Sequence, residues 1–391
     1  MNGCVDKWEK IVLFRSIAFR YSPFAIRYSV FAMLAAAALL FAQALPAALS
    51  VTELVPWDVA DGGVTSFSIN GHCAAGDSVF ISFDGVNCSQ LVRIDDPLGS
   101  PHRTQLISPA QWTAASGKTA MNTGDGLGLV GPYVQMAEPA TDEIWRCDTN
   151  NSALFRYVTT NAVRTLTGKT SVQFVAGTPP DPVSGEQVVF DSTSRCMLLV
   201  TGSNQVSVLV TAAQLTNLYG DSSVARSMVF DRHKNLYWGH NKTSSLYMRT
   251  SNAVLQIALA SNAIYAATGV SNVTFVALHY APDNKLYFAD YASGAILSYD
   301  PHAPDPAATL HVLITQDELT NSIAGPPAYN IYGLHWYGTG MGLTFISEYN
   351  PSGAVYRIVP EPAGLLLLLA FCALTRHITR SDRFVRSVQP C

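Results

Sequence analysis

Short apolar segments separated by turns recur along the middle of the chain. The clearest are Asn235–His240, Lys285–Asp290 and Gly342–Ser347, and weaker copies are Ser78–Ser82, Glu143–Cys147 and Gln187–Asp191. Their first apolar residues, Val79, Ile144, Val188, Leu236, Leu286 and Leu343, are 65, 44, 48, 50 and 57 residues apart. A repeat of about 40 to 50 residues built from short strands is typical of the blades of a β-propeller.

A second pattern precedes each of these segments. It is a triplet with large apolar residues at its ends and a variable residue at its centre, as the period-two alternation of a strand requires. The triplets are Phe67–Ile69, Val134–Met136, Val172–Phe174, Met228–Phe230, Leu278–Tyr280 and Leu334–Trp336. We expect these strands to be the innermost ones, with Ser68, Gln135, Gln173, Val229, His279 and His335 facing the central channel.

A third repeat predicts short helices. Ser108 with Gln111, Thr211 with Gln214 and Thr315 with Glu318 each match the capping box, in which a hydroxyl and a Glu or Gln satisfy the free N–H groups of a helix start. The boxes are 103 and 104 residues apart, which is close to two blades. This spacing predicts one helical turn after blades 1, 3 and 5.

The sequence therefore predicts an all-β fold, a six-bladed β-propeller over residues 45–358. A seventh blade stays open as an alternative, because the spacing of 65 residues after Val79 leaves room for more strands. The spare segment Val51–Trp57 is predicted to pair with Ala354–Ile358 and close the ring, which removes both open sheet edges. The elements Leu236–Trp238 and Leu286–Asp290 resemble those of NHL- and YWTD-type propellers.

The first 44 residues are predicted to be a secretory signal peptide. Five Lys and Arg residues precede an apolar run from Tyr28 to Ala44, and small residues follow it. Ala42-Gln43-Ala44 fits the cleavage pattern, with cleavage after Ala44, and Ala48–Ser50 is a second candidate. An uncleaved membrane helix is the alternative, since about 17 apolar residues approach the spanning minimum.

The last segment, residues 359–391, carries another apolar run. Pro360-Glu361-Pro362 is followed by twelve apolar or small residues, Ala363–Leu374, and then by a basic tail. This order resembles the bacterial PEP-CTERM sorting signal, although the apolar run is short for a transmembrane helix and the tail extends to Cys391. The resemblance implies an exosortase-type enzyme and the export machinery as partners, transient anchoring in the inner membrane, and final placement at the cell envelope, outer surface or outside the cell.

Charge excludes nucleic acid as a partner. The whole chain has 24 Lys and Arg against 28 Asp and Glu. The leader carries five basic and two acidic residues, and the tail carries four basic residues and one acidic residue. The body therefore keeps 15 basic and 25 acidic residues. A body with a net charge of about −10 has no basic surface for a phosphate backbone.

Four of the seven cysteines lie in the body, and an exported domain permits disulfides. Proximity along the chain favours Cys73 with Cys88 and Cys147 with Cys196, and free buried thiols remain the alternative. No close cysteine or histidine cluster with metal-ligand spacing is present in the sequence.

Candidate chemistry is sparse. Gly126-Leu-Gly128-Leu-Val-Gly131 formally matches a dinucleotide-binding motif, but Pro132 and a predicted strand follow it instead of a helix, so we interpret it as a loop. His279 and His335 are the weak catalytic candidates, as a metal site or an acid–base pair at the axis, but we favour the interpretation that these side chains fill the narrow channel and form hydrogen bonds there.

Three function classes follow. We favour a surface-sorted propeller that binds glycan or protein, or acts as a scaffold, without a cofactor. The alternatives are a lactonase- or lyase-like enzyme in the channel, with a metal or the histidine pair, and a purely structural matrix component. No complete catalytic set is visible, which weighs against an enzyme.

Overall fold

The structure is a computed structural model that describes residues 49–55, 68–84, 89–224, 227–322, 331–336, 343–347 and 354–360. The propeller forms one compact unit, Ser50–Val359. The leader to Ala44, Cys88, Glu361, Pro362 and the apolar run after them lie outside the described residues.

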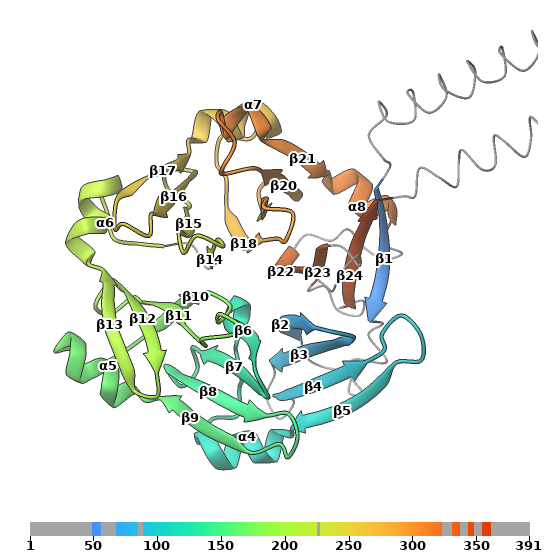
Figure 1. Cartoon of the computed structure of the whole chain (residues 1–391), viewed down its shortest axis with the longest axis vertical. Coiled ribbons are helices and arrows are strands. Elements are labelled where there is room, and N and C mark those ends of the chain that lie inside the picture. Colours follow the sequence, from blue (N-terminus) through green and yellow to red (C-terminus); the bar gives the residue numbers. More distant parts are fainter. Residues whose placement is uncertain are drawn as a thin grey trace, which may run out of the picture. The chain divides into compact units, whose positions relative to one another are not determined.

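Six antiparallel sheets of four strands form a ring (Figure 1), so the chain is a six-bladed β-propeller. Blade 1 contains β2 Ser68–Ala75, β3 Ser78–Asp84, β4 Gln90–Asp95 and β5 His102–Ile107. Blade 2 contains β6 Leu127–Val130, β7 Tyr133–Glu138, β8 Glu143–Asp148 and β9 Leu154–Val158. Blade 3 contains β10 Phe174–Gly177, β11 Gln187–Asp191, β12 Cys196–Gly202 and β13 Gln205–Val210.

The second half of the ring repeats this order. Blade 4 contains β14 Met228–Phe230, β15 Leu236–His240, β16 Ser245–Arg249 and β17 Leu255–Leu259. Blade 5 contains β18 Phe275–Tyr280, β19 Leu286–Asp290, β20 Ala295–Tyr299 and β21 His311–Ile314. Blade 6 contains β22 Ile331–Trp336, β23 Leu343–Ser347, β24 Ala354–Pro360 and, from the other end of the chain, β1 Leu49–Val55.

The predicted closure of the ring is confirmed. β1 is the outer strand of blade 6 beside β24, and Arg357 Nε donates a hydrogen bond to Thr52 Oγ1 at 2.8 Å. Leu54, Val55 and Val355 pack in one buried cluster with blade 1. Because β1 covers the outer side of β24, this strand of the last blade is paired on both sides.

Side-chain burial falls from the inner to the outer strands. Every residue of the second strands β11, β15 and β19 is buried, which explains their nearly continuous apolar sequence. In the outer strands β13 and β17, by contrast, only the last residue is buried. The apolar sequence pattern is therefore strongest at the second strand of each of these blades, where both faces of the sheet are covered.

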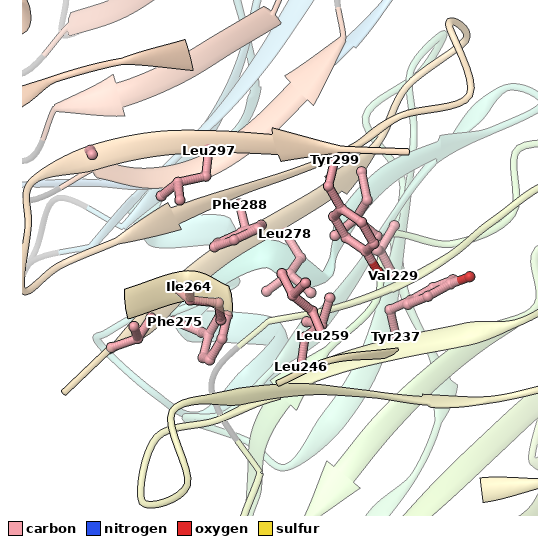
Figure 2. Packing of buried hydrophobic residues seen from close by; sticks show 13 residues of the cluster. Val229, Tyr237, Leu246, Leu259, Ile264, Phe275, Leu278, Phe288, Leu297 and Tyr299 are labelled. Carbon is pink, nitrogen blue, oxygen red and sulfur yellow. The ribbon is translucent and has the colours of Figure 1, made fainter. Parts of the chain in front are cut away.

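The apolar cores lie between successive blades. Figure 2 shows one of them, in which Leu246 and Leu259 of blade 4 pack with Phe288 and Leu297 of blade 5. Gly239 on β15 allows this close approach, since an added Cβ there would overlap the Phe275 ring. Each blade is thus held by its neighbours, and burial of these side chains supplies most of the stabilisation.

The three predicted helices are present, and the structure adds two more. The capping boxes of α4 Pro109–Ser116 and α6 Ala212–Tyr219 are present, and Thr315 and Glu318 exchange the same two bonds at α8 Gln316–Ser322. In the described part of the chain, helices also follow blades 2 and 4, namely α5 Thr160–Thr167 and α7 Ser261–Thr268. All five helices have two turns. The α5 cap, Thr159, was missed because Ala162 stands where a capping box has Glu or Gln.

The prediction of one strand order was wrong. Val134–Met136 belongs to β7, the second strand of blade 2, and the innermost strand is β6, within the glycine-rich segment that we interpreted as a loop. Glycine is needed here because a Cβ on Gly126 would contact Ala137 and one on Gly128 would contact Pro180, at 2.8 and 2.6 Å. The short strand β6 packs closely against its neighbours, as an inner strand does, but it lacks the triplet with apolar ends by which we predicted the inner strands.

Cys147 and Cys196 do not form the predicted disulfide. Both thiols are free, and so is that of Cys73. Cys147 on β8 packs with Cys73 in the core between blades 1 and 2, whereas Cys196 on β12 packs against the core between blades 2 and 3. Burial raises the pKa of the Cys73 and Cys147 thiols to about 12, so both are protonated and unreactive at neutral pH.

Candidate functional site

The channel opens into a hollow at each end. Neighbouring inner strands are parallel, as the bridge between Gly177 and Ser227 shows for blades 3 and 4. One hollow is lined by residues near the starts of inner strands, including Asn70 and Val276, and the other by residues at their ends, including Phe230 and Trp336. We call the second hollow the strand-end pocket.

The strand-end pocket is the larger of the two, with a volume of about 940 Å³ against about 390 Å³. Phe230, His279, Tyr280 and Trp336 form the side contributed by blades 4, 5 and 6. Pro179, Pro180, Asp181 and Pro182 form the side contributed by blade 3. A concave site of this size with mostly apolar walls is typical of a ligand-binding pocket.

The loop of residues 178–186 is held firmly at the pocket edge. It joins β10 to β11 and is longer than the five-residue loops at the same place in blades 4 and 5. Gln135 Nε2 donates to the carbonyl oxygen of Gly185 at 3.1 Å, and Gln187 Nε2 donates to that of Thr178 at 2.9 Å. Three prolines further restrict the backbone, so the loop presents a preformed wall.

An ion pair ties this wall to blade 4. Lys234 Nζ lies 2.7 Å from Asp181 Oδ2 and 3.1 Å from Glu186 Oε2. Hydrogen bonds from Lys234, Ser184 and Val183 lower the pKa of Asp181 to about 2, overcoming the opposing effect of burial. All three side chains are partly exposed, so the pair orients the loop and adds little to global stability.

Three histidines from three inner strands meet at the channel side of the pocket. The ring centroids of His72 and His335 are 4.7 Å apart, and those of His279 and His335 are 5.5 Å apart. His72 lies on β2, His279 on β18 and His335 on β22. His72 and His335 are buried, whereas His279 is half-buried and lines the pocket.

The hydrogen bonds assign the tautomer of His72. Thr344 Oγ1 donates to the carbonyl oxygen of His335 at 2.9 Å, so it must accept the 2.9 Å hydrogen bond from His72 Nε2. His72 therefore carries its proton on Nε2. The buried Nδ1 atoms of His72 and His279 have no hydrogen-bond partner.

All three imidazoles are neutral at pH 7. Burial and the neighbouring histidines lower the pKa of His279 and of His335 to about 3. Burial, with a further effect of His335, holds the pKa of His72 well below its ordinary value of 6.5. The cluster can therefore donate or accept hydrogen bonds, but a base this weak is poorly matched to proton abstraction at neutral pH.

The predicted polar ring forms only in part. His279 and His335 do lie together, but Gln135 is on the second strand of its blade, Gln173 is exposed beside the smaller hollow, and Val229 packs in an apolar core. The Ser68 side chain lies outside the described residues. His72 was missed because it is four positions beyond Ser68, and a register shift between Ile69 and Gly71 breaks the alternation that would have linked them.

A second polar cluster stands at the pocket rim. His302 Nε2 lies 3.2 Å from Asp231 Oδ2, and the His233 and His302 rings meet edge to face with centroids 4.9 Å apart. Asp231 also accepts hydrogen bonds from the backbone N–H groups of His233 and Asn235. This buried carboxylate holds the turn between β14 and β15 in place.

Neither a metal centre nor a membrane helix is found within the described ranges. No group of three or more His, Cys, Asp or Glu residues there has an arrangement that would hold a metal ion. Among the same residues, no helix has the length and apolar character needed to cross a membrane.

Comparisons with known proteins support the fold. No protein-family model matches the chain, and no curated protein matches it. Among solved structures, a protein of unknown function from Bacteroides thetaiotaomicron is similar with a TM-score of 0.52 and 12% identity, over 80% of this chain and 76% of that one. Virginiamycin B lyase from Staphylococcus aureus gives 0.51 and 12%, over 80% and 99%. A luciferin-regenerating enzyme gives 0.51 and 10%, over 81% and 96%. Identities this low show a shared fold alone.

Proposed function

We propose that this β-propeller is an exported, surface-sorted binding module whose ligand occupies the strand-end pocket. The observation that carries the proposal is the pocket itself, about 940 Å³ with a preformed proline wall facing aromatic side chains. Ligand sites in general are concave, mostly apolar and formed before the ligand arrives.

Export and sorting rest on the two ends of the sequence. A basic and then apolar leader ending at Ala44 supports secretion, and Pro360-Glu361-Pro362 followed by an apolar run supports recognition by an exosortase-type enzyme. On this proposal the C-terminal segment, residues 359–391, anchors the chain transiently in the inner membrane, and the propeller ends in the envelope or outside the cell.

Cell fractionation tests the sorting step. The full chain and a variant with Pro360, Glu361 and Pro362 all replaced by alanine would be expressed in a bacterium that has an exosortase. We expect the parent chain at the surface or in the medium, and the variant retained with the inner membrane. Equal distribution of the two would rule out this sorting route.

An enzyme in the channel is the second candidate, and the histidine cluster is what favours it. His279 borders the pocket and lies beside His335, so a bound substrate would meet an imidazole. The lowered pKa values weigh against general-base catalysis at pH 7. A substrate that changed the surroundings of His279 and His335, or a metal ion bound by their rings, would favour the enzyme over the binding module.

Native mass spectrometry of the protein purified from its host separates these candidates. A bound organic molecule that is lost in Trp336→Ala supports the binding module. A stoichiometric metal that is lost in the double variant His279→Ala, His335→Ala supports the enzyme. A protein with neither, and without affinity for any compound offered to it, supports a purely structural matrix component and overturns the proposal.

A further inference from the structure

The charged groups around the strand-end pocket are already engaged with the protein. Asp181 Oδ1 accepts hydrogen bonds from the N–H groups of Val183 and Ser184, while Oδ2 faces Lys234. Asp231 Oδ1 accepts two backbone hydrogen bonds, and Oδ2 accepts from Asn235 Nδ2 at 2.7 Å. The charge of Asp181 is therefore paired with Lys234, and both oxygens of Asp231 are occupied by groups of its own turn.

Charge in the lining is also balanced. Asp181 and Asp231 stand against Arg232 and Lys234, so the lining carries no net charge. Arg232, at the rim, already donates from Nε to His233 Nε2 at 3.1 Å. Arg232 is exposed, so water screens its charge. A charged ligand placed among the aromatic side chains would therefore lose hydration without an opposite charge beside it, which is costly.

What remains for a ligand is largely apolar. Phe230, Tyr280 and Trp336 offer aromatic rings, and Pro179, Pro180 and Pro282 offer apolar edges. A sugar has a hydroxyl on nearly every carbon, and each one buried without a partner costs about 1 to 3 kcal/mol. The few unengaged polar groups in the lining cannot serve so many hydroxyls.

We infer that the pocket binds a neutral organic molecule with a flat apolar ring system and a single polar group directed at His279. His279 suits that role because it borders the pocket, lies beside His335 with ring centroids 5.5 Å apart, and is neutral. Flat rings gain from stacking on aromatic side chains in addition to the burial of their area. This inference rests on the proposed function and narrows its ligand class to exclude glycans.

The test is a fluorescence titration of the full chain with N-phenyl-1-naphthylamine, a neutral probe with two ring systems and one N–H group. We expect saturable binding at one site per chain. Trp336→Ala and Tyr280→Ala should each weaken binding at least tenfold, and His279→Phe should weaken it several-fold while keeping an apolar ring. Tyr291→Ala is the matched control, because Tyr291 is 49% exposed and lies outside the lining of either hollow.

Two variants on different blades guard against loss of folding, and thermal unfolding of each is recorded in parallel. Unchanged probe affinity in folded Trp336→Ala and Tyr280→Ala proteins overturns the inference. A second outcome is that neutral oligosaccharides bind, that the probe does not displace them, and that the same variants abolish their binding. This outcome overturns the ligand class but leaves the proposed function standing. Failure of both the probe and the oligosaccharides to bind counts against the proposed function as well.

Discussion

A buried acid at the end of the second strand recurs from blade to blade. Asp191 accepts a hydrogen bond from the N–H group of Gln173, and Asp290 accepts one from that of Thr274, both at 2.8 to 2.9 Å. Glu138 accepts from the N–H group of Asn122 in the same way. The acidic residue that ends the Leu-Tyr-Phe-Ala-Asp element therefore fixes the chain just before the inner strand, which is a structural role.

Removing this acid should destabilise the propeller. Asp290→Ala removes a buried acceptor that is shared by the N–H groups of Thr274, Ala292 and Ser293. We expect a loss of about 2 to 4 kcal/mol in the free energy of unfolding, measured by urea denaturation, because a buried unsatisfied donor costs about 1 to 3 kcal/mol. Asp77→Ala, at an exposed turn, is the control, and an equal effect of the two would contradict the structural role.

The histidine cluster makes stability depend on pH. Because the folded-state pKa values lie below 6.5, the unfolded chain binds more protons between about pH 6.5 and pH 3. The contribution of these neutral histidines to the free energy of unfolding is therefore fully present above pH 6.5. It falls as the pH is lowered, by at most about 1.4 kcal/mol per pH unit for each buried imidazole.

Urea unfolding at several values between pH 7.5 and pH 4 measures this slope. His72→Gln should flatten it, since one proton-binding group of the unfolded state is removed. A slope in His72→Gln equal to that of the parent protein would show that the cluster does not control acid stability.

At the scale of the element, the helices after the outer strands differ in how they begin. α6 starts at Thr211, whose side chain accepts from the N–H group of Gln214, whereas α7 starts at Ala260 without a side-chain cap. Both end at a glycine in the left-handed conformation, Gly220 and Gly269. The two helices are thus a matched pair that differs at the N-terminus.

This pair gives opposite predictions. Thr211→Ala should lower the free energy of unfolding by about 1 kcal/mol, and Ala260→Ser should raise it by a similar or smaller amount. Thermal and urea unfolding measure both changes. A gain from Thr211→Ala, or a clear loss from Ala260→Ser, would contradict the assignment of these caps.

Strands that are buried on both faces could be predicted from the sequence, and strands shaped by distant residues could not. Leu236–His240 and Leu286–Asp290 were found because they are packed on both faces and so are apolar throughout. β6 was not found, because its Gly128 is selected by the nearby Pro180, which is distant in sequence. His72 was not found for the same kind of reason, since only the ring brings β2 beside β22.

At the scale of the whole molecule, one strand from the start of the chain completes the last blade. Leu54 is 1% exposed and packs with side chains of blade 1 and with Val355. The ring is therefore complete only when β1 is in place, and the edge of β24 is otherwise open.

Leu54→Asp should weaken this closure. Loss of the buried leucine costs about 2 to 5 kcal/mol, and burial of the carboxylate adds to it. We expect a lower melting temperature and faster hydrogen exchange at the amides of β24, with smaller changes in blade 3. Val183→Asp adds the same charge at a side chain that is 91% exposed and should leave both quantities unchanged. Equal protection of β24 in both variants would contradict a closing role for β1.

The pairing of β1 with β24 also decides where the chain can be cut and rejoined. Thr52 lies opposite Arg357, and Figure 1 shows β1 running against β24, so Ser50 and Val359 end at the same edge of blade 6. A circular permutant could join them by a short turn and begin instead at the exposed residues Asn252 and Ala253. Blade 6 would then be a continuous meander, and the two ends of the chain would meet between β16 and β17 of blade 4. The blade that contains both chain ends is thus set by where the chain begins. A permuted chain would move that closure from blade 6 to blade 4.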